Sequence, residues 1–122
     1  MMKTVVIGAG PMGLRHAEAA LSLGLDLVAM CDTREDALKN AADRTALPAG
    51  ALFSSATDLF ATVRPEIAII ATNTPSHSEI TCLAAQGDVT HILCEKPMAA
   101  SLAECDRMIE TCEKAGTNLA IN

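Results

Sequence analysis

Short apolar runs alternate with longer amphipathic stretches along the whole chain. Continuous runs rich in β-branched residues are typical of strands buried on both faces of a parallel sheet. They predict strands at 4–8, 25–31, 51–53, 66–71, 91–94 and 118–121. Helical periodicity between serine, proline and glycine end signals predicts helices at 11–23, 34–46, 54 or 55 to 63, 76–86 and 101–115.

This alternation of strand and helix predicts an α/β protein. Repeated βα units form a parallel sheet with helices on both faces and right-handed crossovers. We expect a Rossmann fold, a doubly wound sheet of about six strands in the order 3-2-1-4-5-6. The chain has 122 residues and contains no internal repeat, low-complexity tract or linker. Residues 1–122 are therefore expected to form a single domain.

A glycine turn separates the first predicted strand from the first helix. Gly8, Gly10 and Gly13 stand there in G-x-G-x-x-G spacing, with Pro11 and Met12 between them. In such a turn one glycine permits the tight bend, one lets the backbone approach a pyrophosphate, and one lets the helix pack on the strand. The helix N-terminus adds N–H groups and a positive dipole end. We predict that these five residues bind a dinucleotide; a turn without a ligand is the alternative.

The second predicted strand, 25–31, is followed by Asp32, Thr33 and Arg34. A carboxylate about 20 residues after the glycines is placed to accept the adenosine ribose hydroxyls. This predicts NAD over NADP, because a 2′-phosphate would meet a like charge. Arg34 leaves NADP open, since a guanidinium can pair with that phosphate. The alternatives are a helix cap for Asp32 and a solvated first-turn position for Arg34.

A third polar segment follows the fourth strand. Thr72, Asn73 and Thr74 are expected beside the nicotinamide ribose, with His77 as a further cofactor contact at the start of the next helix. A lone histidine is more often a capping or packing group than a catalytic base, and His16 on the first helix is interpreted as structural.

Glu95, Lys96 and Pro97 form the fourth polar segment, after the fifth strand. Pro97 disfavours a helical backbone at Lys96 and favours a cis peptide. A fixed ammonium here would hydrogen-bond a substrate hydroxyl and stabilise an alkoxide as hydride leaves; a surface ion pair between Glu95 and Lys96 is the alternative. Because the carboxyl ends of parallel strands share one edge, all four polar segments are expected to converge there.

Composition narrows the class of partner. The net charge of −6 argues against nucleic acid or an anionic membrane, and no apolar segment reaches the ~20 residues that span a bilayer. Five cysteines without a C-x-x-C pair favour reduced thiols in a cytoplasmic protein. No clustered histidine and cysteine spacing predicts a metal site. We therefore expect a cytoplasmic protein with a small-molecule partner.

Three motifs together resemble the glucose–fructose oxidoreductase and inositol dehydrogenase family (Gfo/Idh/MocA). They are V-V-I-G-A-G-P-M-G-L-R-H at 5–16, A-T-N-T-P-S-H at 71–77 and C-E-K-P at 94–97, and the resemblance covers essentially the whole chain. It implies an N-terminal NAD(P)-binding domain in which Lys96 contacts cofactor and substrate and is catalytic, while Glu95 shapes the nicotinamide pocket. Asn73 stands where many relatives have proline.

The resemblance also implies a second α/β domain, absent from these residues, that brings substrate specificity, a catalytic histidine or aspartate and often a subunit interface. We expect the cofactor domain of an NAD(P)-dependent oxidoreductase that acts on a sugar, cyclitol or related hydroxyl compound. The resemblance also allows the full-length protein to form homo-oligomers. The alternative is a non-catalytic NAD(H)-binding sensor. A methyltransferase is disfavoured, because the glycine turn opens directly into a helix.

Overall fold

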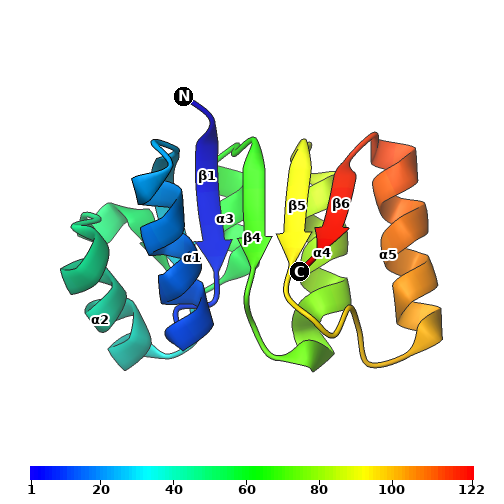
Figure 1. Cartoon of the computed structure of the whole chain (residues 1–122), viewed down its shortest axis with the longest axis horizontal. Helices are drawn as coiled ribbons and strands as arrows, with labels where there is room; N and C mark the ends of the chain where they lie inside the picture. The colour runs from blue at the N-terminus through cyan, green and yellow to red at the C-terminus, as the bar shows by residue number, and fades with distance from the viewer.

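The computed structural model describes all residues from 1 to 122. Its centre is a six-stranded sheet in the order β3-β2-β1-β4-β5-β6, in which every neighbouring pair is parallel. Figure 1 shows the strand arrows pointing the same way. The strands are β1 (Lys3–Ile7), β2 (Asp26–Cys31), β3 (Leu52–Phe53), β4 (Ile67–Ile70), β5 (His91–Cys94) and β6 (Asn118–Ile121). The predicted fold class and strand order are confirmed.

The helices also form where the sequence predicts them, with small shifts at their ends. They are α1 (Pro11–Ser22), α2 (Glu35–Thr45), α3 (Ala56–Thr62), α4 (His77–Gln86) and α5 (Leu102–Ala115), with 3₁₀ turns η1 (Ala49–Ala51) and η2 (Thr74–Ser76). The serines before α3 and α5 cap their helices: Ser55 Oγ accepts the Asp58 N–H, and Ser101 Oγ accepts the Glu104 N–H. Helix α4 begins one residue later than predicted because η2 occupies 74–76.

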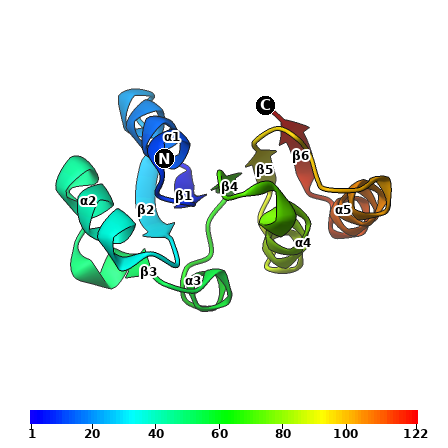
Figure 2. The ribbon, with the colours of Figure 1, turned by 90° about the horizontal axis from the view of Figure 1, so that it is seen from below.

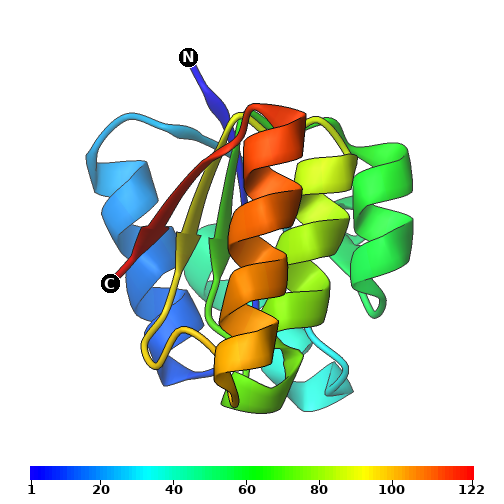
Figure 3. The ribbon, with the colours of Figure 1, turned by 90° about the vertical axis from the view of Figure 1, so that its right-hand side faces the viewer.

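The helices cover the sheet in two layers, and each layer has its own apolar core. Helices α1 and α2 lie on one face, over a core that includes Val6, Leu14 and Met30. Helices α3, α4 and α5 lie on the other, over a core that includes Ile7 and Leu59 (Figure 2; Figure 3). Both cores are mainly aliphatic and rich in small side chains, which lets helices approach the sheet closely. None of the helices combines the length and the apolar character needed to cross a bilayer.

The strand direction places the chain's chemistry at one edge. The glycine turn and the segments after β2, β4 and β5 all follow the carboxyl ends of their strands. The C-terminus lies at the same edge, since the Asn122 N–H donates to the Cys94 carbonyl oxygen at 2.9 Å. In Figure 1 this edge is the lower one, where α1, α4 and α5 begin. We call it the carboxyl rim.

Candidate functional site

Direct contacts at the carboxyl rim connect the predicted site segments to one another. Backbone atoms of the glycine turn reach Asp32, since the Ala9 N–H donates to Asp32 Oδ2 at 2.8 Å. Helix α1 reaches the segment after β5, where His16 Nε2 lies 2.7 Å from Glu95 Oε1. Asp32 and Lys96 therefore open onto the same edge of the sheet, as the sequence predicts.

Two glycines of the turn are required by packing. Gly8 has φ +106°, and a Cβ on it would lie 2.5 Å from the Ala71 carbonyl oxygen. A Cβ on Gly13 would overlap the Gly8 carbonyl oxygen. These glycines thus permit the bend and the close approach of α1 to β1 and β4.

Gly10 differs, because an added Cβ would meet no atom within 4 Å. It is the N-cap residue of α1, and Pro11 follows at the first helical position. No side chain caps this helix, and its first turn contains no acidic residue. The N–H groups and positive dipole end of α1 therefore face open space beside Gly10. This arrangement fits the diphosphate of a dinucleotide.

Both carboxylate oxygens of Asp32 accept backbone N–H groups. Oδ2 accepts Ala9 N–H and Oδ1 accepts Arg34 N–H, each at 2.8 Å. Neither donor lies within α2, which begins at Glu35, so Asp32 does not cap that helix. The side chain is half-buried and stays accessible at the rim.

The Arg34 guanidinium pairs with Asp36 instead of Asp32. Its Nη2 lies 2.8 Å from Asp36 Oδ2, and both side chains are at least 70% exposed. This hydrogen bond lowers the pKa of the Asp36 carboxyl and raises the pKa of the Arg34 guanidinium. Thr33, which precedes Arg34, is exposed.

His77 is buried behind two loops of the rim. The ring is 1% exposed, with Nδ1 2.9 Å from the Pro97 carbonyl oxygen and Nε2 3.0 Å from the Thr72 carbonyl oxygen. It holds the two loops together through their backbones, and neither ring nitrogen is left for a contact with a cofactor. Asn73 is exposed, and Thr72 and Thr74 are half-buried.

Glu95 is buried and bound by three elements. Its Oε1 accepts His16 Nε2–H at 2.7 Å and Asn122 Nδ2–H at 2.9 Å, while Oε2 accepts the Lys96 backbone N–H at 3.3 Å. The His16 hydrogen bond, followed by that of Asn122, lowers the pKa of the Glu95 carboxyl. The carboxylate is ionised at neutral pH.

The surface ion pair between Glu95 and Lys96 does not form, because the salt bridge of Glu95 is to His16. Lys96 is exposed, and its peptide bond to Pro97 is cis. Sequence reasoning missed the contacts of His16 and Asn122 with Glu95. Both residues are distant from Glu95 in sequence, and no motif signalled their pairing.

Two buried thiols flank the site without joining its chemistry. Burial raises the pKa of Cys31 and of Cys94 to about 11, so both stay protonated at neutral pH and are poor nucleophiles. No group of three histidine, cysteine, aspartate or glutamate side chains is arranged to hold a metal ion.

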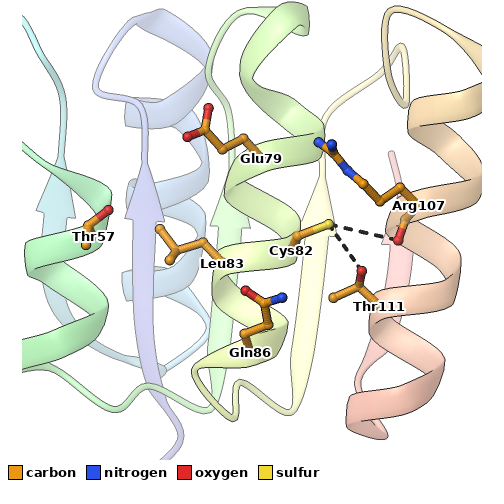
Figure 4. Close-up of a pocket in the computed structure, with 7 residues that line it drawn as sticks. All are labelled: Thr57, Glu79, Cys82, Leu83, Gln86, Arg107 and Thr111. Atoms are coloured by element: carbon orange, nitrogen blue, oxygen red, sulfur yellow. Dashed lines mark hydrogen bonds between the residues drawn. The ribbon is translucent and has the colours of Figure 1, made fainter.

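A hollow on the helical face is separate from the carboxyl rim. It has a volume of about 370 Å³ and is lined by Thr57, Glu79, Cys82, Leu83, Gln86, Arg107 and Thr111. Figure 4 shows these side chains on the outer surfaces of α3, α4 and α5, where Cys82 Sγ lies 3.4 Å from Thr111 Oγ1. None of the predicted site residues lines it. We therefore place the candidate site at the rim.

The fold and the rim together define a dinucleotide-binding Rossmann protein of the α/β class. Residues 2–122 match the Gfo/Idh/MocA family, described as "Oxidoreductase family, NAD-binding Rossmann fold". The chain belongs to this family, as the motifs indicate, and the Rossmann fold of the family binds NAD.

Two of the relatives that the chain matches are dehydrogenases. The chain is 33% identical over 121 residues to D-apiose dehydrogenase from Paraburkholderia graminis, with 98% of this chain and 32% of the relative covered. It is 31% identical over 115 residues to myo-inositol 2-dehydrogenase from Thermotoga maritima, with 93% and 34% covered. An Agrobacterium radiobacter oxidoreductase, solved with NAD⁺, L-tartaric acid and magnesium, superposes with a TM-score of 0.92 at 30% identity, with 99% and 35% covered. The chain thus spans about a third of the length of these relatives.

Proposed function

We propose that residues 1–122 form the NAD-binding domain of a longer dehydrogenase that acts on a sugar, cyclitol or related hydroxyl compound. The observation that carries the proposal is the shared rim: the glycine turn, Asp32 and Lys96 meet at one edge of a sheet that matches an NAD-binding oxidoreductase family. Sugar and inositol dehydrogenases among the relatives support the substrate class.

In this proposal each rim segment holds one part of the cofactor. The diphosphate lies at the glycine turn and the N-terminus of α1, and the adenosine ribose hydroxyls bond to Asp32. The loop after β4 passes beside the nicotinamide ribose, and the segment after β5 borders the nicotinamide. The proposed contacts are Gly8, Gly10, Pro11, Met12, Gly13, Asp32, Thr33, Arg34, Thr72, Asn73, Thr74, Glu95 and Lys96.

Lys96 is the proposed catalytic residue of this domain. NAD supplies the hydride acceptor or donor at its nicotinamide ring. The Lys96 ammonium donates a hydrogen bond to the substrate hydroxyl oxygen and stabilises the negative charge that develops there. The carboxylate of Glu95 already accepts hydrogen bonds from His16 and Asn122, and its lowered pKa makes it a weak base, so it does not take the substrate proton. The proton acceptor and most substrate contacts then come from outside these residues, and the exposed Lys96 favours a catalytic domain over a pure NAD(H) sensor.

Asp32 makes NAD the preferred cofactor. Its carboxylate at the ribose site would repel the 2′-phosphate of NADP, and the nearby guanidinium of Arg34 is engaged by Asp36. All five cysteines are free thiols that form no disulfide, and a reducing cytoplasm is therefore the proposed location. Homo-oligomers of the full-length protein would form through residues outside this domain.

Calorimetry of the 122-residue chain with NAD⁺, NADH, NADP⁺ and NADPH tests the proposal. We expect saturable binding of NAD(H) in preference to NADP(H), with negligible turnover of inositol or aldopentoses by this chain alone. Absence of binding by all four dinucleotides would refute the function, and tighter binding of NADP(H) would refute the role given to Asp32.

A further inference from the structure

The buried carboxylate of Glu95 links three elements that are separate in the sequence. His16 approaches it from α1, Asn122 from the end of β6, and the backbone of Lys96 from the segment after β5. Oε1 therefore accepts two side-chain donors, and Oε2 accepts the N–H of the proposed catalytic lysine. These are the polar groups that bind the carboxylate: one imidazole, one amide and one backbone N–H.

We propose that His16 is a positioning residue that holds Glu95 and, through it, the backbone of Lys96 at a fixed place relative to the glycine turn. This inference rests on the proposed function, because it assigns the contact to the nicotinamide end of the dinucleotide site. His16 touches Glu95 and does not itself contact the reacting atoms.

The position of His16 on α1 explains how it can fix Lys96 relative to the glycine turn. The helix begins at Pro11 beside the diphosphate site, and at 1.5 Å per residue His16 lies about 7 to 8 Å further along its axis. A rigid helix thus sets the spacing between the phosphate-binding end and the lysine. Hydrogen bonds to an ionised group are stronger than those between neutral groups, which makes this link a firm one.

The burial of Glu95 makes the loss of His16 costly for local order. The Glu95 side chain is 11% exposed and the His16 side chain 14%, so water compensates poorly for a lost donor. Asn122 would still bind Oε1, and the sheet would remain intact. Removal of His16 should therefore loosen the Glu95–Lys96 segment without unfolding the domain.

The test compares His16→Ala with His16→Gln, whose amide keeps a donor, and with His91→Ala as a matched control. His91 opens β5 at the opposite end of the strand, where it pairs with Asn118. Three quantities are measured on the 122-residue chain: the NMR titration of the Glu95 carboxyl, hydrogen exchange of the Lys96 amide, and the Kd values for NADH and for ADP-ribose, which lacks nicotinamide.

For His16→Ala we expect a higher pKa of Glu95, faster exchange of the Lys96 amide and NADH binding weaker by about fivefold, with ADP-ribose affinity kept within about twofold. His16→Gln should recover part of each change, and His91→Ala should cause none. An unchanged Glu95 titration and Lys96 amide in His16→Ala would overturn the inference, as would an equal loss of NADH and ADP-ribose binding.

The two proposals fail in different ways. If the unmodified chain binds no dinucleotide, the proposed function is wrong. The titration of Glu95 and the exchange of the Lys96 amide need no cofactor, so they still decide whether His16 holds this segment.

Discussion

Two acidic residues of the carboxyl rim, Asp32 and Glu95, are held in opposite ways. Asp32, at the end of β2, is half-buried, and its carboxylate accepts only backbone N–H groups, those of Ala9 and Arg34. Glu95, after β5, is buried, and its carboxylate accepts two side chains, those of His16 and Asn122, besides one backbone N–H.

This difference separates a ligand-binding carboxylate from an anchoring one. Asp32 retains accessible acceptor capacity for ribose hydroxyls, because a carboxylate has about four lone-pair positions. The carboxylate oxygens of Glu95 already accept three hydrogen bonds from within the protein, and these bonds fix the backbone beside it. The adenosine corner, made of the glycine turn and Asp32, can therefore bind a ligand. The anchoring corner, made of Glu95 and Lys96, holds the lysine backbone in place.

The largest expected effect lies at the glycine turn, on which the adenosine corner depends. In Gly13→Ala the new Cβ would overlap the Gly8 carbonyl oxygen, so the helix must move away from the sheet. We expect a loss of about 3 kcal/mol or more in the free energy of unfolding, measured by urea denaturation. Gly50→Ala is the matched control, because its Cβ meets no atom within 4 Å.

Gly10→Ala separates folding from binding at the same turn. Its Cβ points into open space with φ −75°, so the only cost to stability is that alanine is a poorer N-cap residue than glycine, about 1 kcal/mol or less. NADH binding should nevertheless fall by at least about tenfold, because the methyl group occupies the approach of the diphosphate. Full NADH affinity in Gly10→Ala would contradict the placement of the diphosphate.

The residues of the adenosine corner could be predicted from the sequence, whereas the contacts that hold the anchoring corner could not. The three glycines and Pro11 act through local backbone geometry, and a carboxylate about 20 residues further on belongs to the same known spacing, so the sequence alone predicts them. The Glu95 contacts join residues 79 and 27 positions apart, and such pairing depends on the assembled sheet. The sequence did predict the strand order and the shared rim, because both follow from repeated βα units.

Asp32→Ala gives the next largest effect and tests whether Asp32 is the ligand-binding carboxylate. Loss of the acceptor should weaken NADH binding by about tenfold, while NADPH binding should improve because the like charge is gone. Calorimetry with both cofactors measures the ratio. An unchanged ratio of the two Kd values would mean that Asp32 does not contact the ribose.

The Glu95 anchor should show a smaller effect that depends on pH. Its pKa in the folded protein lies below the ordinary value of 4.5, so its stabilising contribution is fully present above that value and is lost as pH falls through the folded pKa. The difference in unfolding free energy between the unmodified chain and Glu95→Gln should be about 1 kcal/mol at pH 7 and shrink below pH 4.5. A difference that is constant down to pH 3 would argue against the anchor.

The smallest expected effect concerns Arg34, the one cation beside the ligand-binding carboxylate. Asp36 holds its guanidinium at 2.8 Å on a highly exposed surface, where such a pair is weak. In Asp36→Ala the guanidinium is released to reach a 2′-phosphate, so NADPH affinity should rise by about twofold with NADH affinity unchanged. The gain should fade in 0.5 M salt, because exposed charges are screened, and it should be absent when Arg34→Ala is added. A gain that survives removal of Arg34 would show that Asp36 acts on the phosphate by itself, and Arg34 would then have no part in the choice of cofactor.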